Sequence, residues 1–332
     1  MRGKGKRKIR YNRIFIITLV TALLVTGAYK NVGDFLTLMI DRPNGDIDTT
    51  SSKSDVQATL PINKQEPINF NASSGDLYSP SAILVRLMDQ KVAFRTGSEE
   101  RIYPASLTKI MTAIVVIDNV SSLKESIVLP EKIFSDLNKA NASMAGFLPG
   151  EKVPAIDLLY GSLLASGADA SMSLALHVSD TESDFTKLMN EKGKELGMDN
   201  SNFTNVSGLH DDNHYTTVKD IAILLEYALG NETFRQIFTS VSYTTKSTKL
   251  HPDGITFYST MFEKMDSNKF DGGRILGGKT GYTDEAGLCL ASLAEKNGTE
   301  YILVTAGAVG DHYTEQYHIT DAFTVFGEYL NQ

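Results

Sequence analysis

The chain has 332 residues, of which 42% are hydrophobic and 22% charged, a composition that suits one or two globular domains and excludes disorder throughout. Its formal net charge is −8, and the first thirteen residues alone carry seven lysines and arginines. The rest of the chain is therefore acidic, at −15, which argues against nucleic acid as a partner. Cys289 is the single cysteine, so no intramolecular disulfide forms, and its apolar neighbours predict a buried side chain that is not a nucleophile.

The basic amino terminus is followed by a mainly apolar segment, residues 14–28. Positive charge before an apolar stretch is typical of a secretion signal, with the start of the chain in the cytoplasm. The stretch is short for a spanning helix, which needs about 20 residues, and Thr26 with Ala28 offers only a weak cleavage site. Residues 1–30 are thus a signal anchor or a cleaved signal peptide. The body is expected outside the cytoplasm, either at the cell membrane or secreted.

A polar, irregular stretch with several Pro, Gly, Ser and Thr residues covers residues 31–78 and is interpreted as a linker or stalk. One globular body is predicted for residues 79–332. It begins with a hairpin, because two apolar runs flank Asp89-Gln90, and apolar positions at helical spacing behind Ser106 predict a helix. Further helices are predicted at 155–164, 168–178, 184–196, 218–229 and 319–330, with a β-rich run at 301–309. This order indicates an α+β fold in which helices flank an antiparallel sheet.

Ser106 and Lys109 form a Ser-x-x-Lys motif at the start of the predicted helix. Residues i and i+3 share one face of a helix, so the Lys109 amine is expected beside the Ser106 hydroxyl. A serine is a weak nucleophile until a base takes its proton, and lysine acts as that base only when its pKa is lowered. Burial and a second cation, for which Lys279 is the candidate, both lower a lysine pKa. Alone, the motif is also explained by a helix cap followed by an exposed lysine.

The run Gly-Gly-Lys-Thr-Gly-Tyr-Thr covers residues 277–283. Glycines permit close approach of another backbone, so we expect a strand edge to which a substrate peptide adds as an extra strand. Lys279 supplies positive charge, and Thr280 and Thr283 offer hydroxyls to a terminal carboxylate. Taken alone, this run is explained better by a glycine-rich turn between strands.

Ser166-Gly167-Ala168 lies in a loop before a predicted helix, 60 residues after Ser106 and 113 residues before Lys279. With three motifs in this order, the chain resembles the penicillin-binding, active-site serine D-alanyl-D-alanine carboxypeptidases of low molecular mass, peptidase family S11. The resemblance covers roughly residues 79–330. It implies a β-lactamase/transpeptidase-like fold with an all-helical subregion, and no metal or cofactor.

The resemblance further implies acyl transfer in two halves. Ser106 attacks the penultimate D-alanine carbonyl of a peptidoglycan stem peptide, Lys109 takes its proton, and Ser166 relays a proton to the departing D-alanine. Water then hydrolyses the acyl-enzyme, and β-lactams are expected to acylate the same serine. The amides of Ser106 and Tyr282 are implied to form the oxyanion hole. The residues implied to bind substrate are Lys279, Thr280, Gly281, Tyr282 and Thr283.

Two positions depart from the family pattern. Ala168 stands where the family usually has Asn, and it can neither hydrogen-bond the lysine nor hold the substrate amide, so slower catalysis is expected. Asp169 follows and is expected to cap the helix. Relatives often carry an arginine beyond the Lys-Thr-Gly strand that helps hold the substrate carboxylate, but Arg274 is the last arginine here. The alternatives are substitution by His312 or His318, neither of which is assigned, or binding by Lys279 and the threonines alone.

Other functions remain as alternatives. A β-lactamase or esterase on the same scaffold would turn the β-lactam acyl-enzyme over rapidly, and a non-enzymatic β-lactam or muropeptide sensor would bind without releasing product. A zinc site is not expected, since His210 and His214 occur without a His-Glu-x-x-His motif, and His214 is interpreted as bracing the active-site loop. Whether such an activity would serve routine wall maturation or glycopeptide resistance is left open by the sequence.

Overall fold

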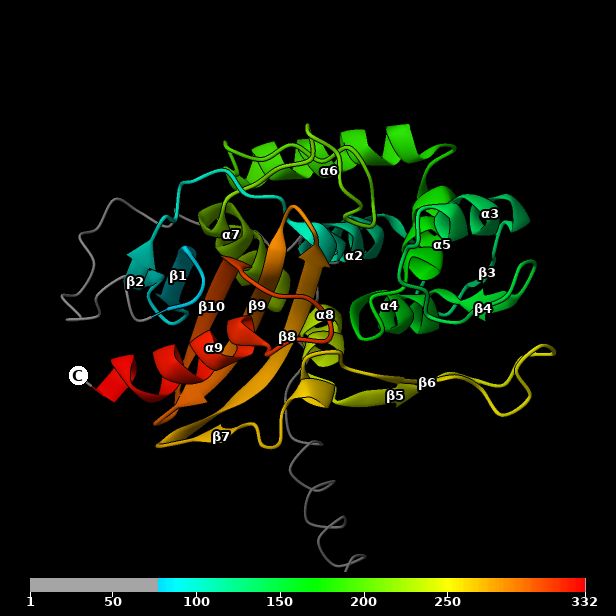
Figure 1. The fold of residues 1–332 in the computed structure, drawn as a ribbon. Coiled ribbons are helices and arrows are strands. Elements are labelled where there is room, and N and C mark those ends of the chain that lie inside the picture. The colour runs from blue at the N-terminus through cyan, green and yellow to red at the C-terminus, as the bar shows by residue number, and fades with distance from the viewer. Residues whose placement is uncertain (1–76, 332) are drawn as a thin grey trace, which may run out of the picture. The chain divides into compact units, whose positions relative to one another are not determined.

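The structure, a computed structural model, describes residues 77–331 (Figure 1). The predicted signal segment and linker, residues 1–78, lie outside the described residues except for Leu77 and Tyr78. No helix within residues 77–331 is long and apolar enough to cross a membrane.

A six-stranded antiparallel sheet in the order β2-β1-β10-β9-β8-β7 forms the centre of the molecule. The predicted hairpin is present, and the turn places Gln90 in the left-handed region at φ 58°. The strands are β1 (Ser81–Arg86), β2 (Lys91–Thr96), β7 (Lys269–Phe270), β8 (Gly273–Thr283), β9 (Gly287–Lys296) and β10 (Thr299–Ala308). Two small two-stranded sheets pair β3 (Ser126–Val128) with β4 (Lys152–Pro154) and β5 (Ser242–Thr244) with β6 (Thr256–Tyr258).

Helices cover both faces of the sheet. The helices are α2 (Thr108–Asn119), α3 (Glu131–Lys139), α4 (Ala155–Leu163), α5 (Ala168–Val178), α6 (Glu182–Leu196), α7 (Val218–Leu229), α8 (Glu232–Phe238) and α9 (Tyr317–Gly327). Short 3₁₀ turns are η2 (Ala105–Leu107), η3 (Phe262–Lys264) and η4 (Tyr329–Asn331). Every predicted helix is found within a few residues of its expected bounds, whereas α3 and α8 were not predicted.

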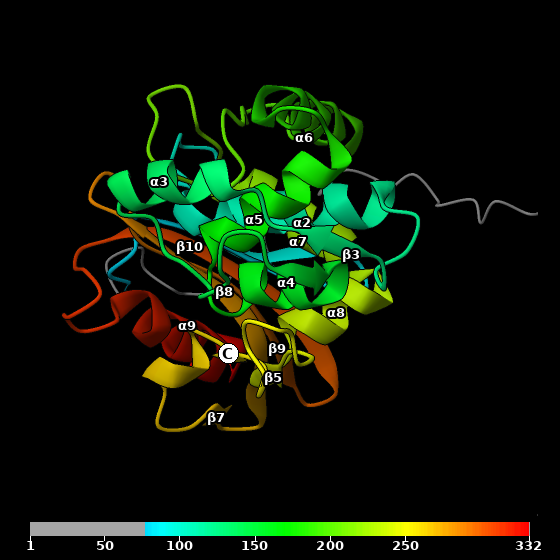
Figure 2. The same cartoon turned by 90° about the vertical axis from the view of Figure 1, so that its right-hand side faces the viewer.

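The core is divided by the sheet into two parts, because side chains along a strand alternate between its faces. On β10, Ile302 and Val304 join the core built around α2, α4, α5 and α7, while Leu303 joins the smaller core under α9. Figure 2 shows α9 on one side of the strands and the helical block on the other. The predicted α+β fold, an antiparallel sheet flanked by helices with an all-helical region, is confirmed.

Candidate active site

Ser106 lies in the turn η2, immediately before α2, and Lys109 lies in the first turn of that helix. Residues 108–116 of α2 are all buried, so the helix and its lysine are fixed within the core. The Nζ of Lys109 is 2.9 Å from the Oγ of Ser106, as the i, i+3 spacing predicts, and it donates to the carbonyl of Ser207 at 2.5 Å.

Burial sets the electrostatics of the two lysines in the site. Lys109 is 2% exposed, and desolvation lowers its pKa to about 7, with the Asp169 carboxylate acting in the opposite direction. Lys279 is fully buried, and its pKa lies well below the usual value because of desolvation and the charge of Lys109. Burial is therefore the main cause for both, and repulsion between the two amines adds to it at Lys279.

Ser166 connects the two lysines. Its Oγ donates to the Oγ of Ser106 at 2.9 Å, and it accepts a hydrogen bond from the Nζ of Lys279, also at 2.9 Å. Its backbone has φ 60°, a left-handed conformation that costs a non-glycine residue about 1–3 kcal/mol and is concentrated at functional sites. The three motifs thus meet in one hydrogen-bonded chain, Lys279–Ser166–Ser106–Lys109.

Two glycines allow the backbone to close around the nucleophile. A Cβ on Gly208 would lie 1.8 Å from the carbonyl oxygen of Ala105, and Gly208 itself has φ 84°. A Cβ on Gly281 would lie 3.1 Å from the amide nitrogen of Ser106. Strand β8 therefore passes directly beside the turn that carries Ser106, and a side chain at either glycine would push the two segments apart.

The hydroxyls of the β8 residues have different partners. The Oγ1 of Thr280 is 2.7 Å from the Oγ1 of Thr260, which precedes η3 in the chain. The Oγ1 of Thr283 accepts the amide of Ala286 at 3.1 Å and so stabilises the turn between β8 and β9. Thr280 is thus the threonine that pairs with a second hydroxyl at the small cavity described below.

Tyr282 lies at the junction of the strand and the loop that follows β10. Its hydroxyl donates to Asp284 at 2.7 Å, and this contact raises the pKa of the phenol to about 12. The ring meets His312 edge-on, with centroids 4.9 Å apart.

A cavity opens on each side of Ser106. The smaller, of about 140 Å³, contains Ser166, Thr280 and Gly281 in its wall, and the larger, of about 580 Å³, contains Lys109, Ala168 and Thr283. Four residues line both cavities: Ser106, Ser143, Tyr282 and His312. A peptide crossing the site would therefore have its two ends in different cavities with one of its bonds beside Ser106.

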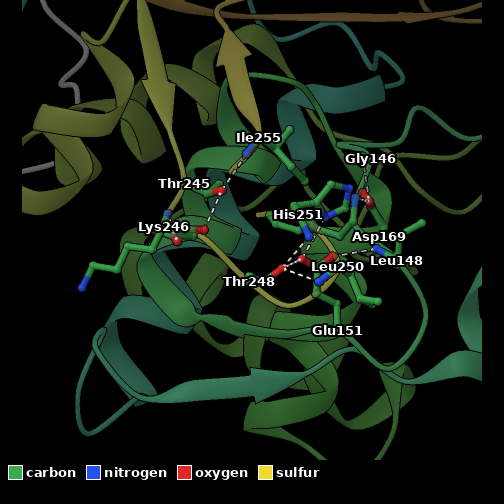
Figure 3. Close-up of polar contacts among 12 residues, drawn as sticks. Gly146, Leu148, Glu151, Asp169, Thr245, Lys246, Thr248, Leu250, His251 and Ile255 are labelled. Carbon is green, nitrogen blue, oxygen red and sulfur yellow. Dashed lines mark hydrogen bonds and ion pairs between the residues drawn. The ribbon is translucent and has the colours of Figure 1, made fainter. Parts of the chain in front are cut away.

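Ala168 is 1% exposed and lines the larger cavity with Lys109. Its amide donates to the carbonyl of Ser143 at 2.7 Å, but its side chain brings no polar atom to the site. The neighbouring Asp169 does not replace the missing amide, because its carboxylate accepts the backbone amides of residues 145–147 at 2.8–3.2 Å. Asp169 was expected to cap a helix. The structure shows that its carboxylate instead stabilises the loop at residues 145–147 (Figure 3).

A second buried carboxylate, that of Glu151, also hydrogen-bonds residues of loops near the site. It accepts the amide of Leu148 at 3.0 Å, the hydroxyl of Thr248 at 2.5 Å, and pairs with the Nδ1 of His251 at 2.9 Å (Figure 3). Thr248 and His251 belong to the connection between β5 and β6, whose far end leads to Thr260. Glu151 thus links the loop after α3 to the connection between β5 and β6.

His214 braces the active-site loop, as predicted. Its Nδ1 accepts the amide of Thr204 at 3.0 Å, so its Nε2–H donates to the hydroxyl of Thr108 at 2.7 Å. Burial lowers the pKa of His214 to about 4, so the ring is neutral. Cys289 is buried, and burial raises the pKa of its thiol to about 12, in agreement with the prediction that it is not a nucleophile.

Residues 68–310 match the family model described as D-alanyl-D-alanine carboxypeptidase, Peptidase_S11. The chain belongs to this family. It is 36% identical over 236 residues to D-alanyl-D-alanine carboxypeptidase DacF of Bacillus subtilis, a match covering 69% of this chain and 57% of that protein. It is 30% identical over 222 residues to the D-alanyl-D-alanine carboxypeptidase of Streptomyces sp. strain K15, covering 63% and 74%.

The fold is shared with solved structures. The crystal structure of the Streptomyces K15 DD-transpeptidase superposes with a TM-score of 0.69 at 24% identity, covering 77% of this chain and 98% of that one. Matches to the curated relatives are partial: the aligned region spans 57% of the Bacillus protein and 60% of DacA of Haemophilus influenzae. The carboxypeptidase family and the fold are thus shown, and the relatives are longer than the aligned region.

The sequence prediction missed several residues of the site. Ser207 lines the larger cavity, Thr260 and Lys264 line the smaller one, and Ser143 lines both. All four come from loops or short turns that carry no recognisable motif.

Proposed function

We propose that this protein is a serine D,D-carboxypeptidase that removes the terminal D-alanine from peptidoglycan stem peptides through an acyl-enzyme on Ser106, and that β-lactams acylate the same residue. The observation that carries the proposal is the position of the Ser106 Oγ, 2.9 Å from both the Lys109 Nζ and the Ser166 Oγ, with a cavity on either side.

In the first half-reaction, neutral Lys109 accepts the Ser106 proton as the Oγ attacks the penultimate carbonyl. A pKa of about 7 keeps a large fraction of Lys109 neutral at neutral pH, so the lysine is suited to act as a base. Oxyanion stabilisation is assigned to the amides of Ser106 and Tyr282, supported by the close approach of β8 to the Ser106 amide at Gly281.

Collapse of the tetrahedral intermediate breaks the bond to the terminal D-alanine, whose nitrogen requires a proton. Ser166, which hydrogen-bonds both the nucleophile and Lys279, is assigned the relay of the proton that Lys109 took from Ser106 to this nitrogen, and the transfer returns Lys109 to its neutral form. Lys279 also donates to the carbonyl of Thr280 at 2.7 Å, so it orders the strand against which the substrate adds. Water then attacks the acyl-enzyme, with Lys109 taking its proton, and the shortened peptide leaves.

The test is to incubate the protein with a diacyl-Lys-D-Ala-D-Ala peptide and to measure released D-alanine beside the Ser106→Ala variant. Release from the parent and none from the variant is expected. No release from the parent, or equal release from both, would contradict the proposal. Rapid regeneration of free enzyme after β-lactam acylation would instead indicate a β-lactamase.

We further propose that the basic and apolar amino terminus, residues 1–30, delivers the catalytic body to the outer side of the cell membrane, as an anchor or as a cleaved signal. The support is its charge pattern: seven cations before residues 14–28. Fractionation of cells that produce the full chain is expected to place it in the membrane or the medium. A variant lacking residues 1–30 should stay in the cytoplasm, and export of that variant would contradict the proposal.

A further inference from the structure

A third cavity, which we call the α3–α5 cavity, has a volume of about 460 Å³ and adjoins the larger cavity at Ser106. Its walls come from α3, α5, the start of α6 and the loop at residues 205–209, and α3 packs against α5 there (Figure 1). Three residues line both this cavity and the larger one: Ala140, Ser207 and Leu209. A ligand in the larger cavity therefore has a path into the α3–α5 cavity.

Apolar side chains form much of the wall of the α3–α5 cavity. Ile133 and Leu137 of α3 are buried, and Met172 and Leu176 of α5 are partly buried against the core. The volume is more than three times the 140 Å³ of the smaller cavity. Burial of methylene groups against such a wall is favourable, so the cavity suits a long aliphatic chain better than a methyl group.

The loop at residues 205–209, which separates the two cavities, is held in one conformation. The side chain of Asn205 accepts two amides of the loop at 2.7 and 3.2 Å, and it donates to a carbonyl of the loop at 2.8 Å. The carbonyl of Ser207 in turn accepts the Nζ of Lys109. The position of the α3–α5 cavity relative to the catalytic lysine is therefore fixed by a short, hydrogen-bonded loop.

Negative charge exceeds positive charge around the α3–α5 cavity. Its charged lining residues are Lys132, Asp136, Asp180 and Glu182. Asp136 pairs with Lys139 at 3.2 Å, but within residues 77–331 no lysine or arginine forms an ion pair with Asp180 or Glu182. Glu182 is half-buried, and desolvation raises the pKa of its carboxyl although it accepts the amide of Val206 at 3.0 Å. A cation beside these two carboxylates would offset the cost of that burial.

We propose that the α3–α5 cavity binds the side chain of the residue that precedes D-Ala-D-Ala in the substrate, an aliphatic chain ending in an ammonium. The methylenes contact α3 and α5, and the ammonium lies at Asp180 and Glu182. This inference rests on the proposed function, because a D-Ala-D-Ala bond at Ser106 leaves the preceding residue in the larger cavity, next to the passage. The site then selects substrates by the length and the charge of that side chain.

The test measures D-alanine release by the full chain from three peptides, Nα-acetyl-Xaa-D-Ala-D-Ala, in which Xaa is lysine, norleucine or alanine. Lysine against norleucine reports the charge, and norleucine against alanine reports the aliphatic chain. The variants are Asp180→Asn, Glu182→Gln and Ala140→Leu, the last of which places a larger side chain where the two cavities meet. Glu191→Gln removes an exposed carboxylate of α6 that does not line the cavity, and it is the matched control.

The parent should prefer lysine to norleucine and norleucine to alanine. Loss of one partly exposed charge pair predicts that Asp180→Asn and Glu182→Gln each lower kcat/KM for the lysine peptide about 5-fold, mainly through KM, and leave the other two peptides unchanged. Ala140→Leu should lower kcat/KM for lysine and norleucine but not for alanine, and Glu191→Gln should change nothing. Equal kcat/KM for lysine and norleucine in the parent, or an equal fall for all three peptides in each variant, would overturn the inference.

A second measurement separates this inference from the proposed function. Two penicillins that carry a 6-aminohexanoyl or a hexanoyl side chain are compared by the rate of Ser106 acylation, followed by intact mass. Faster acylation by the amine in the parent, and loss of this difference in Asp180→Asn, would support the site even if no peptide releases D-alanine and the carboxypeptidase proposal fails. Equal rates for the two penicillins in the parent would overturn the site while leaving the carboxypeptidase proposal intact.

Discussion

The active site has two walls that meet at Ser106, and the protein builds them differently. The helical wall consists of Ser106 and Lys109 at the start of α2 with Ser166 before α5, while the sheet wall consists of residues 279–283 of β8 and the loops against it. In the helical wall Ser106 and Lys109 are three residues apart and fixed by a buried helix, and the contact with Ser166 is the long-range one. In the sheet wall the contacts join residues 20 and 48 positions apart.

The helical wall holds the groups that react, and the sheet wall holds the groups that bind the substrate. In the helical wall, burial lowers the pKa of Lys109. Because this burial depends on the packing of the core, few substitutions around Lys109 would preserve it. The sheet wall offers a strand edge, hydroxyls and an exposed cation, contributed by segments that can vary independently. We therefore expect changes in the helical wall to reduce all acylation reactions, and changes in the sheet wall to alter which compounds react.

The largest effect is expected for Lys109→Met, which removes the base and keeps the volume of the side chain. Acylation by penicillin should fall by about 10²–10⁴-fold, the usual contribution of a general base. In the parent the rate should rise as pH increases through about 7, because Lys109 accepts a proton only when it is neutral. Stopped-flow acylation across pH tests both points, and a variant that keeps this rise would show that another group is the base.

The next largest effect is expected for Gly208, which packs against the turn that carries Ser106. Gly208→Ala would place a Cβ 1.8 Å from the Ala105 carbonyl, at φ 84°. The left-handed conformation alone costs about 1–2 kcal/mol, so both the free energy of unfolding and the acylation rate should fall. Gly193→Ala in α6 is the matched control, since its nearest contact is 3.9 Å away, and it should stabilise the protein by up to about 1 kcal/mol. Similar unfolding free energies for the two variants would contradict the packing described around Ser106.

A smaller change in the acylation rate is expected at Ala168, whose side chain brings no polar atom to the site. Ala168→Asn would bring an amide into the larger cavity beside Lys109, and one neutral hydrogen bond corresponds to an increase in acylation of about 2- to 10-fold. The rate with the diacyl peptide is the measurement. An unchanged or lower rate would show that the site is arranged around alanine, with Ser207 as the sufficient partner of Lys109.

The last effect is on acid stability rather than on the acylation rate, and it concerns the two buried histidines, His214 behind the helical wall and His318 behind the sheet wall. Burial lowers each pKa from 6.5 to about 4. The unfolded chain thus binds more protons, so stability is complete above about pH 6.5 and is lost as pH falls towards 4, by at most about 1.4 kcal/mol per unit for each ring. Urea unfolding at several pH values should show a weaker acid dependence in His214→Gln and in His318→Gln. An unchanged dependence in either variant would contradict the burial of that ring.

The sequence predicted the helical wall better than the sheet wall for a physical reason. Ser106 and Lys109 meet because helical spacing is local, and the buried stripe of α2 follows from its apolar periodicity. The long-range order of the sheet, in which β1 pairs with β10, follows no local pattern. Membership of the family, rather than periodicity, indicated that Ser166 and Lys279 would join the same site.

What the sequence did not predict lies in loops. Lys264 and Thr260 reach the smaller cavity through the segment between β6 and β7, where no periodicity predicts a position in space. The role of Asp169 was also missed, because a carboxylate at the start of a helix is equally explained by capping until the loop at residues 145–147 is seen against it.

The most direct test of the account is to locate the acyl group after reaction with penicillin. Tryptic digestion and mass spectrometry of the parent protein should find one adduct, on the peptide that contains Ser106, and Ser106→Ala should form none. Fast formation of an adduct on any other residue, or acylation of Ser106→Ala at the parent rate, would contradict the central claim that Ser106 is the nucleophile.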